Sequence, residues 1–418
     1  MIDMLSRLSR TSRWLIASAI LILIVISLAA LIRLTPSLKE KFDRKWDFTL
    51  VYLRSILQPV GALPTPEATS NFTALTSSPA TATLPWTAIP TPTPAPLPAR
   101  VMLTPPNYVA SRDQETWNNC GPATLALYLR FYGWSGDQAT IAKVVKPFDT
   151  DRNVNVDELR DYVRSSASWL DAEFRVGGTT NLLRQLIAAG YPVVIEEAFI
   201  VSENYWVNDD HWTGHYLLLT GYDDEQKAFV TQDVYQGPNR WVSYADLDKD
   251  WQAFNRVYLL VYPPDKTSNL QALLGNNWNE TANRQNALKT AQAEAQVNPL
   301  NAFAWFNEGS NLTYLDRYSE AAAAFDRARQ IGLPQRMLRY QFGPFVAYFQ
   351  TSRIDDLLAL TQYALERTPN SEEALLWRGW ALYRKGDRDG AEKAFRMALE
   401  YHPGYADAIN AINYLNGK

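Results

Sequence analysis

The hydrophobic pattern of residues 106–265 changes along the chain from a helical period to a strand-like one. Apolar residues first recur at helical spacing, which predicts four helices, over 123–132, 137–145, 156–164 and 181–189. After Gly190 the apolar runs are short and bounded by turn residues, which predicts four strands, over 191–196, 216–220, 228–231 and 257–262. Helices followed by antiparallel strands are typical of an α+β domain, and we expect one over 106–265.

Residues 268–418 carry a different pattern, in which large and small residues recur together. It runs through Trp305, Gly309, Ala321, Phe325, Ala328 and Pro334, and again through Leu375, Gly379, Leu382, Ala391, Phe395, Ala398 and Pro403. A weaker copy with Tyr348, Leu357, Ala364 and Pro369 keeps a 34-residue spacing. The pattern resembles the tetratricopeptide repeat, a helix pair that hides its apolar side by stacking on the next pair. The resemblance implies an all-α solenoid that docks a substrate or partner protein. A spacer or an oligomerisation surface is the alternative.

An apolar run from Leu15 to Ile32, containing two serines, lies near the N-terminus. At about 1.5 Å per residue it is just long enough to cross the hydrocarbon core of a membrane. It predicts a single-pass transmembrane helix within an N-terminal region, 1–58, of tail, helix and juxtamembrane segment. A cleaved secretory signal is the alternative, because small residues near 27–30 could form a processing site.

Residues 59–105 are rich in Pro, Thr, Ala and Ser and predict a semi-rigid linker, because such a segment cannot bury a core. Basic residues after the apolar run would alone place the rest of the chain in the cytoplasm. A stalk is most useful outside the membrane, however. We therefore expect a cell-membrane protein whose two large domains are extracytoplasmic.

Charge and cysteine content exclude several classes of function. The 40 Lys and Arg residues against 44 Asp and Glu give a net charge of −4, so we expect no nucleic-acid partner. A single cysteine excludes an intramolecular disulfide and cysteine-rich zinc sites. Three histidines leave little material for a histidine-based metal centre, so we expect neither a metal nor a cofactor.

The single cysteine lies in a context typical of a nucleophile. Cys120 comes just before a predicted helix, and Pro122 suits the first turn, so the partial positive charge of the helix N-terminus would favour a thiolate. Gln114 lies six positions upstream, and His215 and then Asp233 follow far downstream. These residue types in this order are the parts of a thiol acyl-transfer site.

The stretches Gln114 to Cys120-Gly-Pro-Ala, Gly-His215-Tyr-Leu-Leu-Leu-Thr-Gly-Tyr-Asp and Phe-Val-Thr-Gln-Asp233 resemble the C39-like cysteine peptidase family. The resemblance implies a papain-like fold, with the cysteine at a helix start and the histidine and aspartate on the sheet. It implies four roles: Cys120 as nucleophile, His215 as general base, Asp233 as the residue that orients the imidazole, and Gln114 as oxyanion-hole donor. The family usually has Pro after the aspartate, whereas this chain has Val234.

Each assignment has an alternative. A lone cysteine is often a small buried hydrophobe. His211 is a second candidate base, in a stretch expected to be a loop, and Asp223 is a second carboxylate, in a predicted hairpin turn where turn chemistry explains it.

The sequence thus predicts a membrane-anchored cysteine peptidase that hydrolyses peptide bonds in a peptide or protein substrate. One alternative is amidase or transglutaminase-like acyl transfer on cell-wall peptides, which the same residues would serve. The other is a catalytically inactive peptide-binding module.

Overall fold

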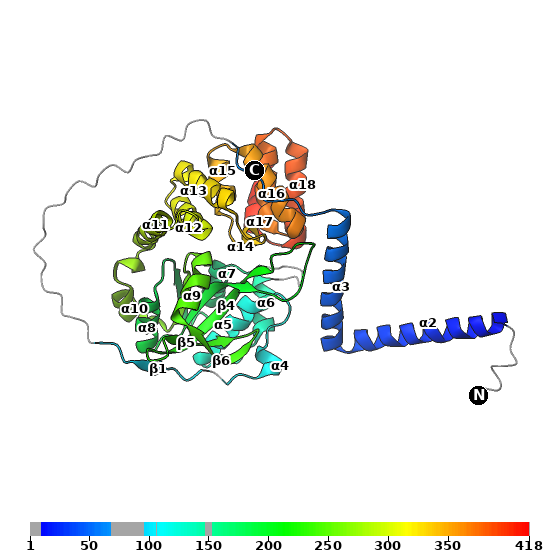
Figure 1. The fold of residues 1–418 in the computed structure, drawn as a ribbon, viewed down its shortest axis with the longest axis horizontal. Helices are drawn as coiled ribbons and strands as arrows, with labels where there is room; N and C mark the ends of the chain where they lie inside the picture. The colour runs from blue at the N-terminus through cyan, green and yellow to red at the C-terminus, as the bar shows by residue number, and fades with distance from the viewer. Residues whose placement is uncertain (1–9, 68–95, 106, 147–152, 418) are drawn as a thin grey trace, which may run out of the picture. The chain divides into compact units, whose positions relative to one another are not determined.

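The computed structural model describes residues 10–67, 96–105, 107–146 and 153–417 (Figure 1). Most of the predicted linker, residues 68–95, and the tail 1–9 lie outside these ranges. The chain divides into two compact units, one of residues 1–60 and 203–209 and the other of residues 61–202 and 210–418.

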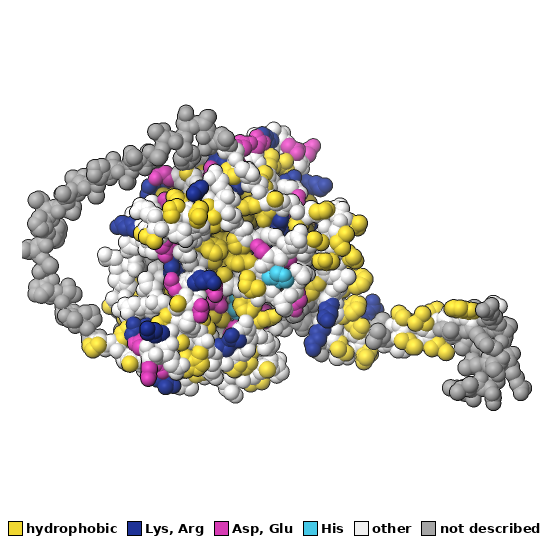
Figure 2. All heavy atoms as spheres, in the orientation of Figure 1, with side chains coloured by type: hydrophobic (Ala, Val, Ile, Leu, Met, Phe, Trp, Pro, Cys, Tyr) yellow, Lys and Arg dark blue, Asp and Glu magenta, His cyan; other side chains and the backbone are white. Residues whose placement is uncertain are grey.

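The first unit is built on two helices, α2 (Arg10–Leu34) and α3 (Pro36–Leu57). Pro36 begins α3, where its missing N–H costs no helical hydrogen bond. The segment 203–209 packs on α3: the Tyr205 ring meets Phe48 edge-on at 4.4 Å between centroids, and the Val207 N–H donates to Ser55 Oγ at 3.2 Å. Hydrophobic side chains are exposed along α2 (Figure 2).

The structure corrects one prediction about this unit. Crossing a hydrocarbon core takes about 20 consecutive apolar residues in a helix. Among the residues that the structure describes, no helix meets the demands of length and apolarity that crossing a membrane makes. The predicted transmembrane helix over Leu15 to Ile32 is therefore wrong, and so is the predicted single-pass location in the cell membrane.

The second unit contains an antiparallel sheet, which in the described residues has seven strands in the order β2-β7-β3-β4-β5-β6, with β1 also paired to β4. The strands are β1 (Arg100–Met102), β2 (Asp171–Arg175), β3 (Val193–Ile200), β4 (Trp212–Asp223), β5 (Ala228–Asp233), β6 (Gly237–Ser243) and β7 (Tyr258–Tyr262). The four predicted strands correspond to β3, β4, β5 and β7. Strands β1, β2 and β6 were not predicted.

Helices cover both faces of this sheet. The α-helices of this region are α4 (Ala110–Asp113), α5 (Cys120–Phe131), α6 (Gln138–Val145), α7 (Val156–Ser166), α8 (Thr180–Ala188), α9 (Tyr244–Trp251) and α10 (Thr267–Leu274), and the 3₁₀ turns are η1 (Gln252–Phe254), η2 (Pro264–Lys266) and η3 (Gly275–Trp278). Adjacent strand residues point to opposite faces, so Val194 packs with α5, α6 and α7 while Ile195 packs with α8, α9 and α10. This mixture of helices and antiparallel strands fits the predicted fold class.

The helices after residue 280 form pairs that stack side by side (Figure 1). They are α11 (Glu280–Val297), α12 (Ala302–Tyr314), α13 (Tyr318–Ile331), α14 (Met337–Tyr340), α15 (Gly343–Gln350), α16 (Ile354–Arg367), α17 (Glu372–Arg384), α18 (Arg388–Tyr401) and α19 (Ala406–Leu415). A Cβ on Gly379 of α17 would lie 2.4 Å from the Phe395 ring of α18, and one on Gly309 would lie 2.7 Å from Phe325. A Cβ would therefore overlap an aromatic ring at both crossings, which are positions where the repeat pattern has a small residue.

The repeats and the sheet share one hydrophobic core within the second unit. Trp212 of β4 stacks on Phe254 at 5.6 Å and meets Tyr340 of α14 edge-on at 5.9 Å, in the same cluster as Phe306 of α12. The Arg336 guanidinium donates to the Trp212 carbonyl at 2.9 Å. Strand β4 is thus packed directly against the repeats.

Candidate active site

The segment before α5 is fixed by one buried amide, that of Gln138 in α6. Its oxygen accepts from the Thr116 N–H at 3.0 Å and from Asn119 Nδ2 at 2.7 Å. Its nitrogen donates to the carbonyls of Gln114 at 2.7 Å and Arg112 at 2.9 Å. This side chain therefore helps to set the path of the backbone that leads into Cys120, together with Lys146, which donates to the Asn118 carbonyl at 2.9 Å. Sequence reasoning missed Gln138, and nothing beside it in the sequence marks this role.

Cys120 is the first residue of α5, as the sequence predicted, and is partly buried. Its position places the thiol at the end of the helix where unpaired backbone N–H groups carry partial positive charge.

His215 of β4 lies next to this thiol and is almost fully buried. A nitrogen of the ring and the Cys120 sulfur lie within 4.8 Å of each other. Its Nε2 lies 3.0 Å from Asp233 Oδ1, while Nδ1 lies 3.9 Å from Glu115 Oε2. The structure therefore brings the predicted cysteine, histidine and aspartate together in one cluster.

Asp233, the last residue of β5, is held in place by the turn that follows. Its Oδ1 accepts from the backbone N–H groups of Tyr235 at 2.8 Å and Gln236 at 3.0 Å, as well as from His215. Burial would raise the pKa of this carboxyl group, but these hydrogen bonds outweigh burial and lower its pKa. The carboxylate is thus ionised and fixed in direction.

The environment of His215 favours its protonated form. Burial opposes the charged ring, yet the hydrogen bond to Asp233 and the neighbouring Cys120 and Glu115 hold the pKa of His215 well above its ordinary value. Burial also raises the pKa of the neighbouring Glu196 and Glu197 to about 8. At neutral pH these two carboxyl groups are therefore mostly uncharged, which leaves Asp233 as the principal anion bonded to the ring.

Comparison with known families decides what kind of domain holds this cluster. Residues 106–259 match the Peptidase_C39 like family. Residues 372–405 match the tetratricopeptide repeat. Both family resemblances that the sequence motifs implied are thus confirmed.

Solved structures similar to parts of the chain include two peptidases. A protein described as a C39-like peptidase from Bacillus anthracis is 16% identical, with 39% of this chain and 96% of that chain covered and a TM-score of 0.30. Xylellain, a cysteine protease from Xylella fastidiosa, is 17% identical, with 40% of this chain and 87% of that chain covered and a TM-score of 0.30. YrrB, a tetratricopeptide-repeat protein with an unusual peptide-binding site, is 16% identical, with 35% and 88% covered and a TM-score of 0.19. No curated protein matches the chain.

Gln114, the predicted oxyanion-hole donor, is exposed in the C39-like domain, at the end of α4. Its side-chain nitrogen donates to the Tyr235 carbonyl at 2.6 Å, and its oxygen accepts from the Tyr108 hydroxyl at 3.3 Å. It therefore bridges to the same turn that holds Asp233. An amide nitrogen carries two hydrogens, so one remains for a second acceptor.

The two alternative residues of the C39-like domain have structural partners. His211 has a left-handed backbone, with φ of 60°, and its Nδ1 lies 3.0 Å from the Val201 carbonyl. Asp223 accepts from the backbone N–H groups of Glu225 at 2.9 Å and Gln226 at 3.2 Å, as a turn residue does. Neither arrangement requires a role in catalysis.

Glu115 is a second residue that sequence reasoning missed. In the described part of the chain, one potential metal-ligand atom each from Glu115, Cys120 and His215 lie within 4.8 Å of one another. A thiolate, an imidazole and a carboxylate are a ligand set that suits Zn²⁺. The position of Glu115 beside Gln114 was the available signal, but no residue pattern set it apart from an ordinary loop carboxylate.

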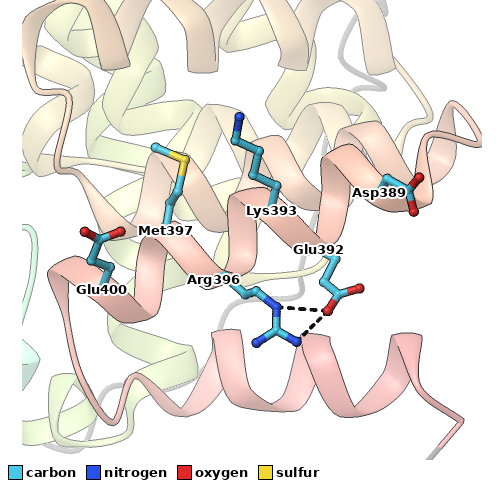
Figure 3. A pocket seen from close by; sticks show the side chains of 6 residues that line it. All are labelled: Asp389, Glu392, Lys393, Arg396, Met397 and Glu400. Carbon is cyan, nitrogen blue, oxygen red and sulfur yellow. Dashed lines mark hydrogen bonds and ion pairs between the residues drawn. The ribbon is translucent and has the colours of Figure 1, made fainter.

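An open hollow elsewhere, on α18, has a different character. It is lined by Asp389, Glu392, Lys393, Arg396, Met397 and Glu400 (Figure 3). Glu392 and Arg396 pair with each other at 2.9 Å, one helical turn apart. Charged residues of this kind along one helix face are typical of a solvated surface. We therefore take the Cys120 cluster, and not this hollow, as the candidate active site.

Proposed function

We propose that this chain is a cysteine peptidase that hydrolyses peptide bonds through Cys120, His215 and Asp233. The observation that carries the proposal is the cluster of Cys120, His215 and Asp233 at the start of a helix, in a domain that matches the C39-like family. The raised pKa of His215 supports a thiolate–imidazolium pair, the reactive form of such a site.

The reaction would proceed in two stages. The Cys120 thiolate attacks the peptide carbonyl carbon, the C–N bond breaks, and His215 gives its proton to the leaving amine. His215 then takes a proton from water, which attacks the thioester. The C–S bond breaks and the thiolate–imidazolium pair returns. Asp233 keeps the ring in place and stabilises its charge throughout.

The negative charge that develops on the substrate oxygen needs hydrogen-bond donors. We assign this role to the backbone N–H of Cys120 and to the side-chain nitrogen of Gln114, whose second hydrogen is not used by Tyr235. One such donor contributes roughly 3 kcal/mol to stabilisation of the transition state. The repeats over 268–418 would dock the substrate or a partner protein beside the peptidase domain over 106–265.

A peptide-library assay with mass-spectrometric detection tests the proposal. The full chain should produce new peptide termini, and both Cys120→Ala and His215→Ala should abolish them while the circular dichroism spectrum stays the same. His211→Ala is the matched control and should retain cleavage. Cleavage that persists in Cys120→Ala, or a chain that cleaves no peptide but binds some of them, would reject peptidase activity in favour of the binding module.

A further inference from the structure

We propose that the repeats contain a peptide-binding site that the chain's own segment Gly61–Glu67 occupies. The segment reads Gly-Ala-Leu-Pro-Thr-Pro-Glu and has no helix or strand of its own. It belongs to the same compact unit as the repeats. The inference goes beyond the proposed peptidase activity and does not depend on it.

Side chains of the repeats contact the backbone of this segment at four points. At its start, Glu366 Oε2 accepts from the Gly61 N–H at 3.1 Å, and Arg367 donates to the Gly61 carbonyl at 2.6 Å. Further along, Arg329 donates to the Pro64 carbonyl at 2.7 Å. At its end, the Glu67 N–H donates to Asp356 Oδ1 at 3.3 Å. Charged side chains of α13 and α16 thus contact the backbone of the segment along its length.

The two arginines are built into the repeats, not attached to their surface. Arg329 and Arg367 are each 5% exposed, yet each directs one nitrogen at a carbonyl of the segment. Behind the segment, Arg329 Nη1 donates to Asp356 and to the Tyr348 hydroxyl, both at 2.9 Å. The Arg367 guanidinium lies 3.6 Å from the centre of the Tyr363 ring. These contacts fix the guanidinium groups before any peptide arrives, which lowers the entropy cost of binding.

The composition of the segment indicates which peptides would fit. Backbone contacts tolerate many sequences, so selectivity must come from side chains. Leu63 packs against the hydrophobic core of the repeats, and the prolines at 64 and 66 hold the backbone extended before it binds. The site therefore suits an extended peptide in which an apolar residue precedes proline, of the form Leu-Pro-x-Pro.

The covalent link makes the segment a built-in competitor. A tethered ligand acts at an effective concentration on the order of millimolar. A free peptide of the same kind must displace the segment before it can dock, so the segment would restrict docking to peptides that are abundant or bind more tightly.

Fluorescence anisotropy on the full chain tests this proposal. The probe is a fluorescein-labelled peptide, Gly-Ala-Leu-Pro-Thr-Pro-Glu, with a control peptide in which Ser replaces Leu and both Pro residues. A released variant carries Leu63→Ser, Pro64→Gly and Pro66→Gly. All proteins carry Cys120→Ala, so the readout is binding alone and is separate from the test of peptidase activity. The released variant should bind the probe about tenfold more tightly than the unreleased chain, because the tethered competitor is weakened.

Two further variants of the released protein locate the site. Glu366 is half-buried, and Glu366→Ala removes the acceptor of the Gly61 N–H. Arg367→Gln removes the guanidinium that donates to the Gly61 carbonyl. Each should weaken probe binding severalfold, whereas Glu392→Ala on α18 should not. If the Arg367→Gln variant does not fold, the Glu366→Ala variant alone tests the site. The proposal is overturned if release does not tighten binding, if the control peptide binds equally well, or if Glu366→Ala leaves binding unchanged.

Discussion

Asp233→Asn isolates the charge of the carboxylate from its hydrogen bonds. The amide keeps an oxygen in the place of Oδ1, so it can still accept from the N–H groups of Tyr235, Gln236 and His215. Only the negative charge beside the imidazole is lost. The pKa of His215 should therefore fall, since that charge helps to hold it above its ordinary value.

The size of the effect follows from the contact. A hydrogen bond to a charged group contributes about 1.5–3 kcal/mol and a neutral one about 0.5–1.5 kcal/mol, so the loss is about 1–2 kcal/mol. The pKa of His215 should fall accordingly, because its protonated form loses this stabilisation. The thiolate–imidazolium pair should become about 5- to 30-fold less populated relative to the neutral pair. Because the charged pair is the reactive form, the variant should lose reactivity near and below neutral pH.

Alkylation by iodoacetamide measures this population, because Cys120 is the only cysteine in the chain. At pH 6 to 7 the variant should react more slowly than the wild type, by at most about 30-fold, because the rate follows the fraction of the charged pair. The two rates should converge above pH 9, where an ordinary thiol, of pKa about 8.5, is ionised without help. Asp223→Asn, a hairpin-turn carboxylate, is the matched control and should follow the wild-type profile. Equal rates at pH 6 in a folded Asp233→Asn variant would refute the assigned role of the carboxylate.

Three other changes have defined outcomes. Gly379→Ala should lower the free energy of unfolding by about 1–3 kcal/mol in urea titrations, because its Cβ would overlap the Phe395 ring; an unchanged midpoint would contradict the packing. Gln138→Ala should lower the free energy of unfolding by about 2–3 kcal/mol and slow the alkylation of Cys120, because the buried groups that bond Gln138 lose those hydrogen bonds. An unchanged rate of alkylation would show that Gln138 does not position Cys120. Zn²⁺ should protect Cys120 from alkylation, reversibly with a chelator, and Glu115→Gln should raise the concentration required at least about tenfold; equal protection would exclude that carboxylate as a ligand.

Local pattern was sufficient to predict much of the fold. The apolar periods located α5 through α8 and four of the strands, and Pro122 placed Cys120 at a helix start, because these features depend on residues close together in sequence. Strand β6 is mostly exposed and has no alternating pattern, so it gave no signal. The role of Gln138 depends on contacts across more than 20 residues, which no local pattern reports.

The linker shows a second limit of such inference. Composition predicted one uniform spacer over 59–105, because proline-rich segments rarely bury a core. The seven residues 61–67 instead lie against α13 and α16, through contacts with residues about 300 positions away. What a segment of this composition binds depends on the surface that it meets, and composition carries no information about that surface.

The core shared by β4 and the repeats has a consequence for how this protein can be divided. Truncation after residue 265 would expose Trp212 and Phe254 to water. It would also remove Arg336, which donates to the Trp212 carbonyl. Trp212 lies only three residues before His215 in the same strand. An excised peptidase fragment should therefore aggregate or lose the alignment of its histidine, whatever its own sequence encodes. Any fusion, expression fragment or evolutionary rearrangement that separates the peptidase domain from the repeats would lose this shared core. We therefore expect the two domains to be inherited together and to be expressed together in the laboratory.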